Sequence, residues 1–316
     1  MAHSNDGRKR PTARRRPGTR RRLRCEVPST VALLADERDF AAMRRYASFT
    51  FDDHATYLRQ MEGLLRSLAA EGTYTSVALF DPADYEEFCA DSHLDPDTSA
   101  SRTRYTAEVA AAGSKVTYEG QPIGRLLPQL VDEAEQQATW EYATALLARG
   151  GDCATCGEDT GKTAFARASQ LLRRLLEAVG PGTHHLVCSV PAEGDVPLVS
   201  VLHTESHADG MLRLGEAAAL IFCTVLAAGI ATDRPGGVVL RTTTPGHPDT
   251  VRGWGLRDGR LRPLSEAEVF DAYCTDADTG EPVPPEPGVA YRAGLPLDDP
   301  EEPKRPEGPE GPQRGA

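Results

Sequence analysis

The stretch TVRGWGLRDGRLRPL, residues 250–264, contains two strand-like runs that meet at Asp258-Gly259. An Asp-Gly pair between two such runs is typical of a two-residue hairpin turn, because both positions require a positive φ. Further strand-like runs precede it at residues 184–190, 196–203 and 237–243, and Ala208-Asp209-Gly210 marks the turn of a second hairpin. Hairpins join antiparallel strands, so the C-terminal half is predicted to be α+β.

One long apolar run lies among these strands, AAALIFCTVLAAGIA at residues 217–231. It is shorter than the roughly 18 consecutive apolar residues that indicate a membrane-spanning helix. A helix that is apolar on every side is typically buried inside a protein core. We therefore expect a buried core helix here and no membrane association.

The N-terminal half has a different pattern, in which helix signals outnumber strand signals. Between Tyr57 and Leu68, apolar residues recur at three- and four-residue steps, and Gly72 follows as the expected helix end. The run YTSVALF at 74–80 is short and rich in strand formers, and Asp81-Pro82 after it is a typical helix start. Helix, strand and helix in this order predict a parallel crossover, and a long amphipathic helix is expected at 127–148.

These patterns predict an α/β to α+β fold, with a helix-rich N-terminal region that has a short mixed sheet, and a C-terminal region with antiparallel hairpins and a buried helix. The predicted segments are a disordered arginine-rich tail at 1–25, a helix-rich α/β region at 26–150, a Cys-x-x-Cys linker at 151–160, an α+β region at 161–297, and a disordered acidic, proline-rich tail at 298–316. In a GC-rich bacterial genome, upstream sequence that is not translated also encodes arginine-rich stretches, so Met43 is an alternative start.

Charge is distributed unevenly along the 316 residues. The chain has 35 basic and 47 acidic residues, of which ten basic residues and one acid fall within the first 24. The remainder therefore has 25 basic and 46 acidic residues, a net charge of about −21, and a surface this acidic repels phosphate backbones. Nucleic-acid association is expected only through the arginine-rich arm, whereas the acidic body would take a protein partner or a small molecule.

The stretch GGDCATCGEDTGKT at residues 150–163 places Cys153 and Cys156 three positions apart, with a glycine after the second. Two thiolates at this spacing can bind one tetrahedral zinc ion, and the glycine lets the backbone turn tightly around the sulfur atoms. A structural zinc site needs two further ligands. We expect one or both of Cys89 and His93 to supply them, because residues four positions apart share a face of a helix. The pair of His184, or His185, with Cys188 is the alternative, but it could give only one ligand, because residues four positions apart on a strand are about 13 Å from each other.

Two other chemical interpretations of this stretch are weaker. A redox Cys-x-x-Cys pair normally follows a strand, whereas this pair follows a predicted helix. A phosphate-binding loop has four residues between its glycines, whereas three separate Gly157 from Gly161, and Glu158 and Asp159 would repel phosphate. Unliganded thiols in a linker between domains are the remaining alternative.

Histidines and a glutamate cluster in the predicted strands of the C-terminal region. HTESH at residues 203–207 places His203, Glu205 and His207 on one face if the strand continues through it. Together with His184 and His185, these side chains could supply imidazole and carboxylate ligands to a catalytic metal. The outer residues of HTESH are about 13 Å apart on a flat strand, so the simpler interpretation is a polar strand that enters a hairpin.

The sequence favours a non-catalytic binding or regulatory protein with a structural zinc site. Seven irregularly spaced cysteines are not a disulfide framework, which indicates the reducing cytoplasm. A metal-dependent hydrolase that uses the histidine and glutamate cluster is the alternative, and nucleic-acid association through the basic arm is a weaker one. No Gly-x-Ser-x-Gly elbow occurs, and the sequence neither requires nor excludes enzyme activity.

Overall fold

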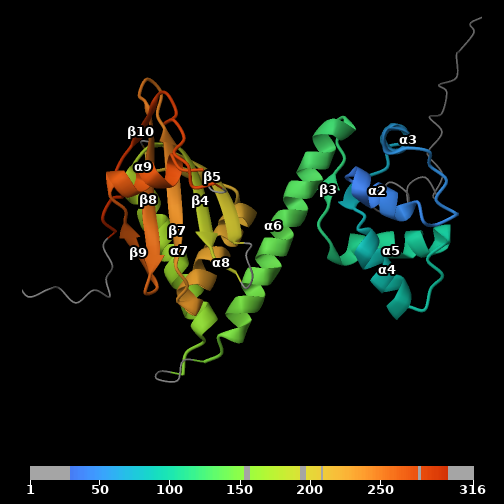
Figure 1. Ribbon diagram of the computed structural model, residues 1–316, viewed down its shortest axis with the longest axis horizontal. Coiled ribbons are helices and arrows are strands. Elements are labelled where there is room, and N and C mark those ends of the chain that lie inside the picture. Colours follow the sequence, from blue (N-terminus) through green and yellow to red (C-terminus); the bar gives the residue numbers. More distant parts are fainter. Residues whose placement is uncertain (1–28, 153–156, 193–196, 208, 277–278, 298–316) are drawn as a thin grey trace, which may run out of the picture. The chain divides into compact units, whose positions relative to one another are not determined.

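The structure is a computed structural model, which describes residues 29–152, 157–192, 197–207, 209–276 and 279–297. Within these residues it contains eight α-helices and ten β-strands, arranged in one sheet of three strands and one of seven. The predicted α/β to α+β fold class is confirmed. The chain forms two compact units that divide inside helix α6, between Gln137 and Ala138, and Figure 1 labels their elements.

The first unit is built around a three-stranded sheet in the order β1-β2-β3. Its elements are β1 (Ser29–Leu33), α2 (Glu37–Met43), α3 (His54–Ala70), β2 (Thr75–Leu79), α4 (Pro82–Asp91), α5 (Ser99–Ala112), β3 (Val116–Thr117) and the first part of α6 (Ile123–Arg149). Strands β1 and β2 are parallel, which confirms the predicted crossover, whereas β3 pairs with β2 in the antiparallel direction. The sheet is therefore short and mixed, as predicted.

Aspartates begin three helices of this unit. Asp36, Asp53 and Asp81 are the N-caps of α2, α3 and α4, and each carboxylate accepts a backbone N–H from the first helical turn. The helices enclose an aromatic core, whose buried rings are those of Phe40, Tyr46, Tyr57, Phe80, Tyr85 and Tyr105. Local capping thus sets where the helices begin, and the rings between them form the core.

The second unit is built around a seven-stranded sheet in the order β10-β8-β7-β4-β5-β6, with β9 paired to β8. Its elements after α6 are α7 (Thr160–Val179), β4 (Gly182–Val190), β5 (Leu198–Ser206), β6 (Leu212–Leu214), α8 (Glu216–Thr232), β7 (Gly236–Thr243), β8 (Asp249–Arg257), β9 (Arg260–Pro263), α9 (Glu266–Tyr273) and β10 (Val289–Tyr291). Only β10 runs parallel to its neighbour among the described strand pairs of this sheet.

The hairpin predicted from residues 250–264 is formed by β8 and β9. Asp258 and Gly259 have φ angles of 53° and 64°, which is the left-handed geometry that a tight hairpin turn requires. Strands β5 and β6 form the second predicted hairpin. The antiparallel character expected of the C-terminal half is therefore confirmed.

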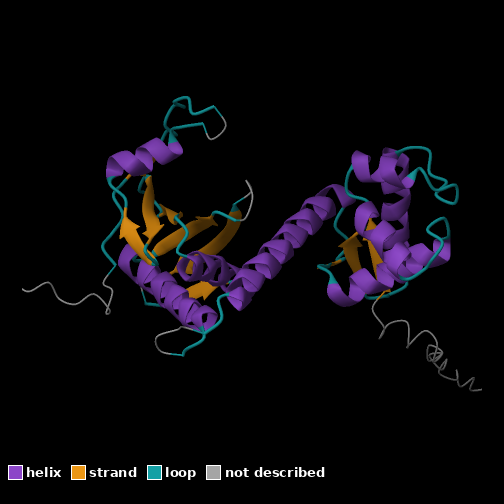
Figure 2. Ribbon diagram, turned by 60° about the horizontal axis from the view of Figure 1, so that its bottom comes forward, coloured by secondary structure: helices purple, strands orange, loops and turns teal. Residues whose placement is uncertain are grey.

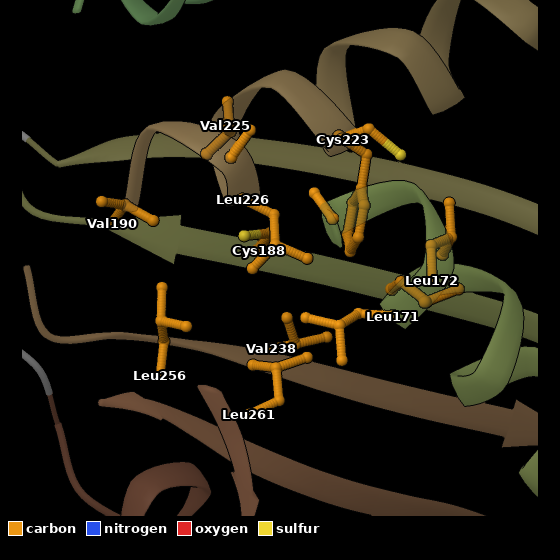
Figure 3. Close-up of a cluster of buried hydrophobic side chains, with 14 of the residues drawn as sticks. Leu171, Leu172, Cys188, Val190, Cys223, Val225, Leu226, Val238, Leu256 and Leu261 are labelled. Carbon is orange, nitrogen blue, oxygen red and sulfur yellow. The ribbon is translucent and has the colours of Figure 1, made fainter. Parts of the chain in front are cut away.

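One face of the seven-stranded sheet packs against α7 and α8. Side chains at even-numbered positions, such as Leu186, Leu202 and Leu240, are fully buried in a core shared with both helices. Figure 3 shows Cys188 and Cys223 among the leucine and valine side chains of this core. Residues 222–229 of α8 are buried, which confirms the predicted core helix. Across the described part of the chain, no helix is long and apolar enough to cross a membrane.

Candidate functional site

The sheet of the second unit has a face on the side opposite α7 and α8. Successive side chains of a strand point to opposite faces, so odd-numbered positions of β4, β5 and β7 lie on this side. Their apolar members are Val187, Val199, Val201 and Val239. Val199 and Val201 each keep 43% of their surface exposed. We call these four valines the open face.

Helix α9 packs over the β8 end of the same side. A Cβ atom at Gly253 of β8 would lie 3.0 Å from Leu264 Cδ1 and 3.2 Å from Val269 Cγ2, so the approach is close. The rings of Phe270 and Tyr273 on α9 lie 5.4 and 5.8 Å from that of Tyr291 on β10. Figure 2 shows this short helix on one side of the sheet and the longer helices of the unit on the other. Helix α9 thus bounds the open face at β8.

The structure separates His184 from the rest of the predicted metal cluster. His184 is fully buried on the helix side, where Nδ1 lies 3.0 Å from Thr242 Oγ1 and Nε2 lies 3.0 Å from the Gly180 carbonyl oxygen. Both ring nitrogens have partners, and burial lowers the pKa of this imidazole. The predicted five-residue cluster is corrected, because the adjacent residues His184 and His185 point to opposite faces.

His185 and His203 lie opposite each other on β4 and β5, beside the open face. Their ring centroids are 4.3 Å apart, and burial, followed by His203 and Arg241, lowers the pKa of His185. Glu205 Oε2 lies 3.9 Å from His207 Nε2, where β5 enters the hairpin. Among the residues that the structure describes, no group of three or more His, Cys, Asp or Glu side chains could hold a metal ion.

Arg241 of β7 is the basic side chain next to His185, and two acids surround it. Its Nε donates to Asp249 at 2.7 Å, and its Nη1 and Nη2 donate to Glu286 at 2.8 and 3.0 Å. These bonds lower the pKa of both carboxyl groups. Two carboxylates around one guanidinium leave this end of the open face with more negative than positive charge.

The residues of the predicted zinc site fall into two groups. Cys153 and Cys156 lie outside the described residues. Cys89 is 2% exposed within the aromatic core of the first unit. Helix α4 ends at Asp91, and His93 is exposed with a φ of 53°. The prediction that Cys89 and His93 share a helix face is therefore wrong, because the chain leaves the helix before His93.

The four cysteines within the described residues are free and buried, and they are Cys89, Cys188, Cys223 and Cys274. Burial raises the pKa of Cys188 to about 12 and also raises the pKa of Cys223. A thiol with such a pKa stays protonated at neutral pH, which makes it a poor nucleophile and a poor metal ligand. Cys188 and Cys223 therefore act as small apolar core residues.

The first unit contains a short repeat that the sequence patterns alone did not reveal. Residues 31–33 and 77–79 are both Val-Ala-Leu, and they pair in register on β1 and β2. Each strand is followed by an N-cap aspartate and, three positions later, by a second aspartate, the four being Asp36, Asp39, Asp81 and Asp84. Burial and neighbouring carboxylates raise the pKa of Asp39 and Asp84. Asp36 and Asp81 accept hydrogen bonds from the first turns of their helices, so we assign these four aspartates a structural role.

The open face was also not singled out from the sequence. Val199 and Val201 alternate with the buried residues Leu198, Ser200 and Leu202. A strand with one solvated face would carry polar side chains at the alternate positions. Valine at those positions is the signal that both faces of this strand are apolar.

Comparison with known proteins gives one similarity. The family described as Domain of unknown function (DUF8829) matches residues 18–121, a third of the chain. The matched segment includes β1 to β3 and lies wholly within the first unit. No curated protein and no solved structure matches the chain. The first unit is therefore similar to a family domain, whereas for the second unit geometry alone indicates a function.

Proposed function

We propose that this chain is a non-catalytic binding protein, and that the open face of the second unit binds an amphipathic helix of a protein partner. The observation that carries this proposal is the row of valines that lies beside the imidazole pair and runs across the strands toward α9. On the other side of the same sheet, apolar side chains are buried against α7 and α8.

The valines form a continuous surface across three strands. Val201, Val187 and Val239 occupy directly paired positions on β5, β4 and β7. Contiguous apolar surface of this kind is typical of protein-interaction sites. Helices are the usual cover for an apolar sheet face, as α7 and α8 are on the opposite side. A partner helix across these valines would therefore bury the open face, as α7 and α8 bury the opposite face of the sheet.

The charges beside the open face favour a partner with basic residues along its apolar stripe. Glu205 lies on the same side of β5, and Asp249 and Glu286 outnumber Arg241 at the other end. The lowered pKa of His185 leaves this imidazole neutral at pH 7. Complementary charge orients a partner and speeds its association more than it adds affinity.

Selection of helical peptides from a displayed library against the full-length protein tests this proposal. We expect selected peptides to carry apolar residues at helical spacing with lysine or arginine beside them. Val187→Glu places a carboxylate at the centre of the open face and should weaken their binding about tenfold or more. Val283→Glu is the matched control, because Val283 is 37% exposed and lies outside this face.

Unchanged binding to the Val187→Glu variant would contradict the proposal, provided that its circular dichroism spectrum matches that of the wild type. Failure of the library to yield any binder would contradict it as well.

A structural zinc site at Cys153 and Cys156 is a separate proposal, supported by the spacing of the two thiols. Elemental analysis should find one zinc ion per chain in the wild type and none in the Cys153→Ser/Cys156→Ser variant. Cys89→Ala tests the predicted third ligand, and its buried position in the aromatic core leads us to expect retention of the metal. Metal-free wild-type protein purified without chelator would overturn the site.

We also propose a cytoplasmic location. The free thiols of Cys89, Cys188, Cys223 and Cys274 support it, because reduced cysteines are typical of a reducing compartment. A reporter fusion whose fluorescence requires a reducing environment would test the location directly.

A further inference from the structure

Strand β5 has an edge that is unpaired over most of its length. It pairs with β4 at all nine of its positions, but with β6 only at Thr204, Glu205 and Ser206. Among the described residues, the other side of the segment Leu198–His203 has no strand partner. We call this segment the free edge. Unpaired edges are ready templates for pairing with another chain.

The backbone groups that point outward from the free edge follow from the neighbouring hairpin. His207 donates its N–H to the Met211 carbonyl oxygen at 2.9 Å, on the side of β6. The N–H and C=O of one residue point to the same neighbour in an antiparallel strand, and successive residues alternate. Val199, Val201 and His203 therefore point their backbone groups outward, whereas the even-numbered residues bond to β4.

The free edge is apolar and carries no formal charge. Its sequence, LVSVLH, contains no Lys, Asp, Glu or Pro, which are the residues that usually protect edge strands from pairing. Half of the ten exposed large hydrophobic side chains in the described residues lie within residues 199–220, namely Val199, Val201, Met211, Leu212 and Leu220. Because the chain carries a net charge of −12, two copies repel each other less at this uncharged edge than at their acidic surfaces.

In addition to these unpaired backbone groups, the free edge has a side-chain hydroxyl, that of Ser200, without a hydrogen-bond partner in the described part of the chain. Its side chain is 4% exposed and points to the helix side of the sheet. Its Oγ atom has no hydrogen-bond partner among the described residues. Buried hydroxyl groups are normally hydrogen-bonded, so a partner supplied by pairing at this edge fits the position.

We propose that two copies of this chain associate through β5, as an antiparallel pair of edge strands with the twofold axis at Ser200. In this register, Val199 lies opposite Val201 of the second copy, and the two residues exchange both N–H···O bonds. Leu198 lies opposite Leu202 of the second copy on the helix side. Each contact occurs twice, as in any isologous interface.

The register follows from Ser200 and from β6. Ser200 occupies a position without backbone bonds across the new pair, where opposed Cα atoms are about 4.5 Å apart and side chains are closest. The two hydroxyl groups then reach each other, as cross-strand serine and threonine pairs do. An axis at Val201 would leave Ser200 opposite Leu202, and it would place Leu198 of the second copy at Thr204, which already pairs with Leu214 of β6.

This association goes beyond the proposed helix binding and does not depend on it, because it uses the edge of the sheet and not its centre. The two seven-stranded sheets become one continuous sheet in the dimer. The open faces of both copies then lie on the same side of it.

Analytical ultracentrifugation of the full-length protein over a dilution series tests the association. We expect a species of twice 34.0 kDa. Val201→Pro removes an outward N–H and spares the bonds to β4, and Val201→Lys adds charge to the edge, so both variants should be monomers that keep the circular dichroism spectrum of the wild type. Leu64→Lys, at a residue of the first unit that is 45% exposed, should remain a dimer.

Cysteine cross-linking tests the register, in a chain whose Cys25, Cys153 and Cys156 are replaced by serine. With an added oxidant, Ser200→Cys should become a covalent dimer, because its Cα distance of about 4.5 Å across the axis suits a disulfide. Val201→Cys should not, because it lies opposite Val199 of the second copy. The same chain with Ser200 and Val201 unchanged is the control.

A wild-type protein that sediments as a monomer throughout overturns the proposal, and so does a Val201→Pro or Val201→Lys variant that stays folded and dimeric. Cross-linking of Val201→Cys without cross-linking of Ser200→Cys overturns the Ser200 register.

Discussion

The two faces of the seven-stranded sheet are built from the same strands and differ in what covers them. On β4, Leu186 is fully buried against the helices, whereas its neighbour Val187 lies half-buried on the open face. His184 and His185 show the same contrast, since the first has partners for both ring nitrogens and the second faces another imidazole. Adjacent residues of like chemistry therefore differ in role because they lie on different faces.

This contrast separates the side that maintains the fold from the side that we propose binds a partner helix. Burial of apolar surface stabilises a protein by roughly 25 cal/mol per Å². The helix side buries most of the apolar surface of the unit, so substitutions there should act on stability. Substitutions on the open face should have small effects on stability and, under the proposed function, act mainly on helix binding.

Leu186→Ala and Val187→Ala test the difference between the two faces directly and should give the largest effect. Loss of a fully buried leucine side chain leaves a cavity, and Leu186→Ala should lower the free energy of unfolding by about 3 kcal/mol. Val187→Ala should lower it by about 1 kcal/mol or less. Both tryptophans, Trp140 and Trp254, belong to the second unit, so their fluorescence during urea unfolding reports on it. Equal losses in the two variants would show that both faces are packed alike.

Gly229→Ala tests how tightly α8 packs on the helix side of the sheet. A Cβ atom at Gly229 of α8 would lie 2.6 Å from Leu256 Cδ2 and 2.9 Å from Val190 Cγ2. Overpacking costs about 1–3 kcal/mol, and alanine returns up to about 1 kcal/mol of helix propensity, so we expect a net loss of about 1 kcal/mol in the free energy of unfolding.

Gly63→Ala in α3 is the matched control, because no atom lies within 4 Å of a Cβ there. It should raise stability by about 0.5–1 kcal/mol. Thermal unfolding followed by circular dichroism measures both variants, and a stabilising Gly229→Ala would show that α8 packs more loosely on β4 and β8 than the structure indicates.

The smallest expected effect is the pH dependence that His184 confers. Burial lowers the pKa of His184 below its ordinary value of 6.5. The unfolded chain therefore binds more protons as the pH falls below 6.5, so the free energy of unfolding is highest above 6.5 and decreases as the pH falls through the folded pKa. An NMR titration of the imidazole measures this pKa directly. A value at or above 6.5 would contradict this pH dependence, because burial would then not be the dominant influence on the imidazole.

Much of the fold could be predicted because its signals are local. Asp258-Gly259 forms the predicted hairpin turn, and Asp81-Pro82 begins α4 as expected. The candidate site could be predicted only in part. Two predictions were wrong. His184 and His185 were expected in one metal cluster, and Cys89 and His93 were expected on one helix face, although α4 ends at Asp91. The first prediction ignored the face to which each side chain points, and the second assumed where the helix ends. Residue spacing specifies neither of these.

The predicted hairpins, the N-terminal start of α4 and the buried helix α8 follow from the sequence alone, because turn residues, capping residues and apolar runs act within a few positions of the chain. That α7 and α8 cover the even-numbered side of the sheet, and that the valines of β4, β5 and β7 lie on the other side, is visible in the tertiary structure alone. The alternation of apolar and polar side chains along a strand predicts that the strand has two different faces. This alternation does not predict which elements pack on each face, because those elements lie far away in the chain.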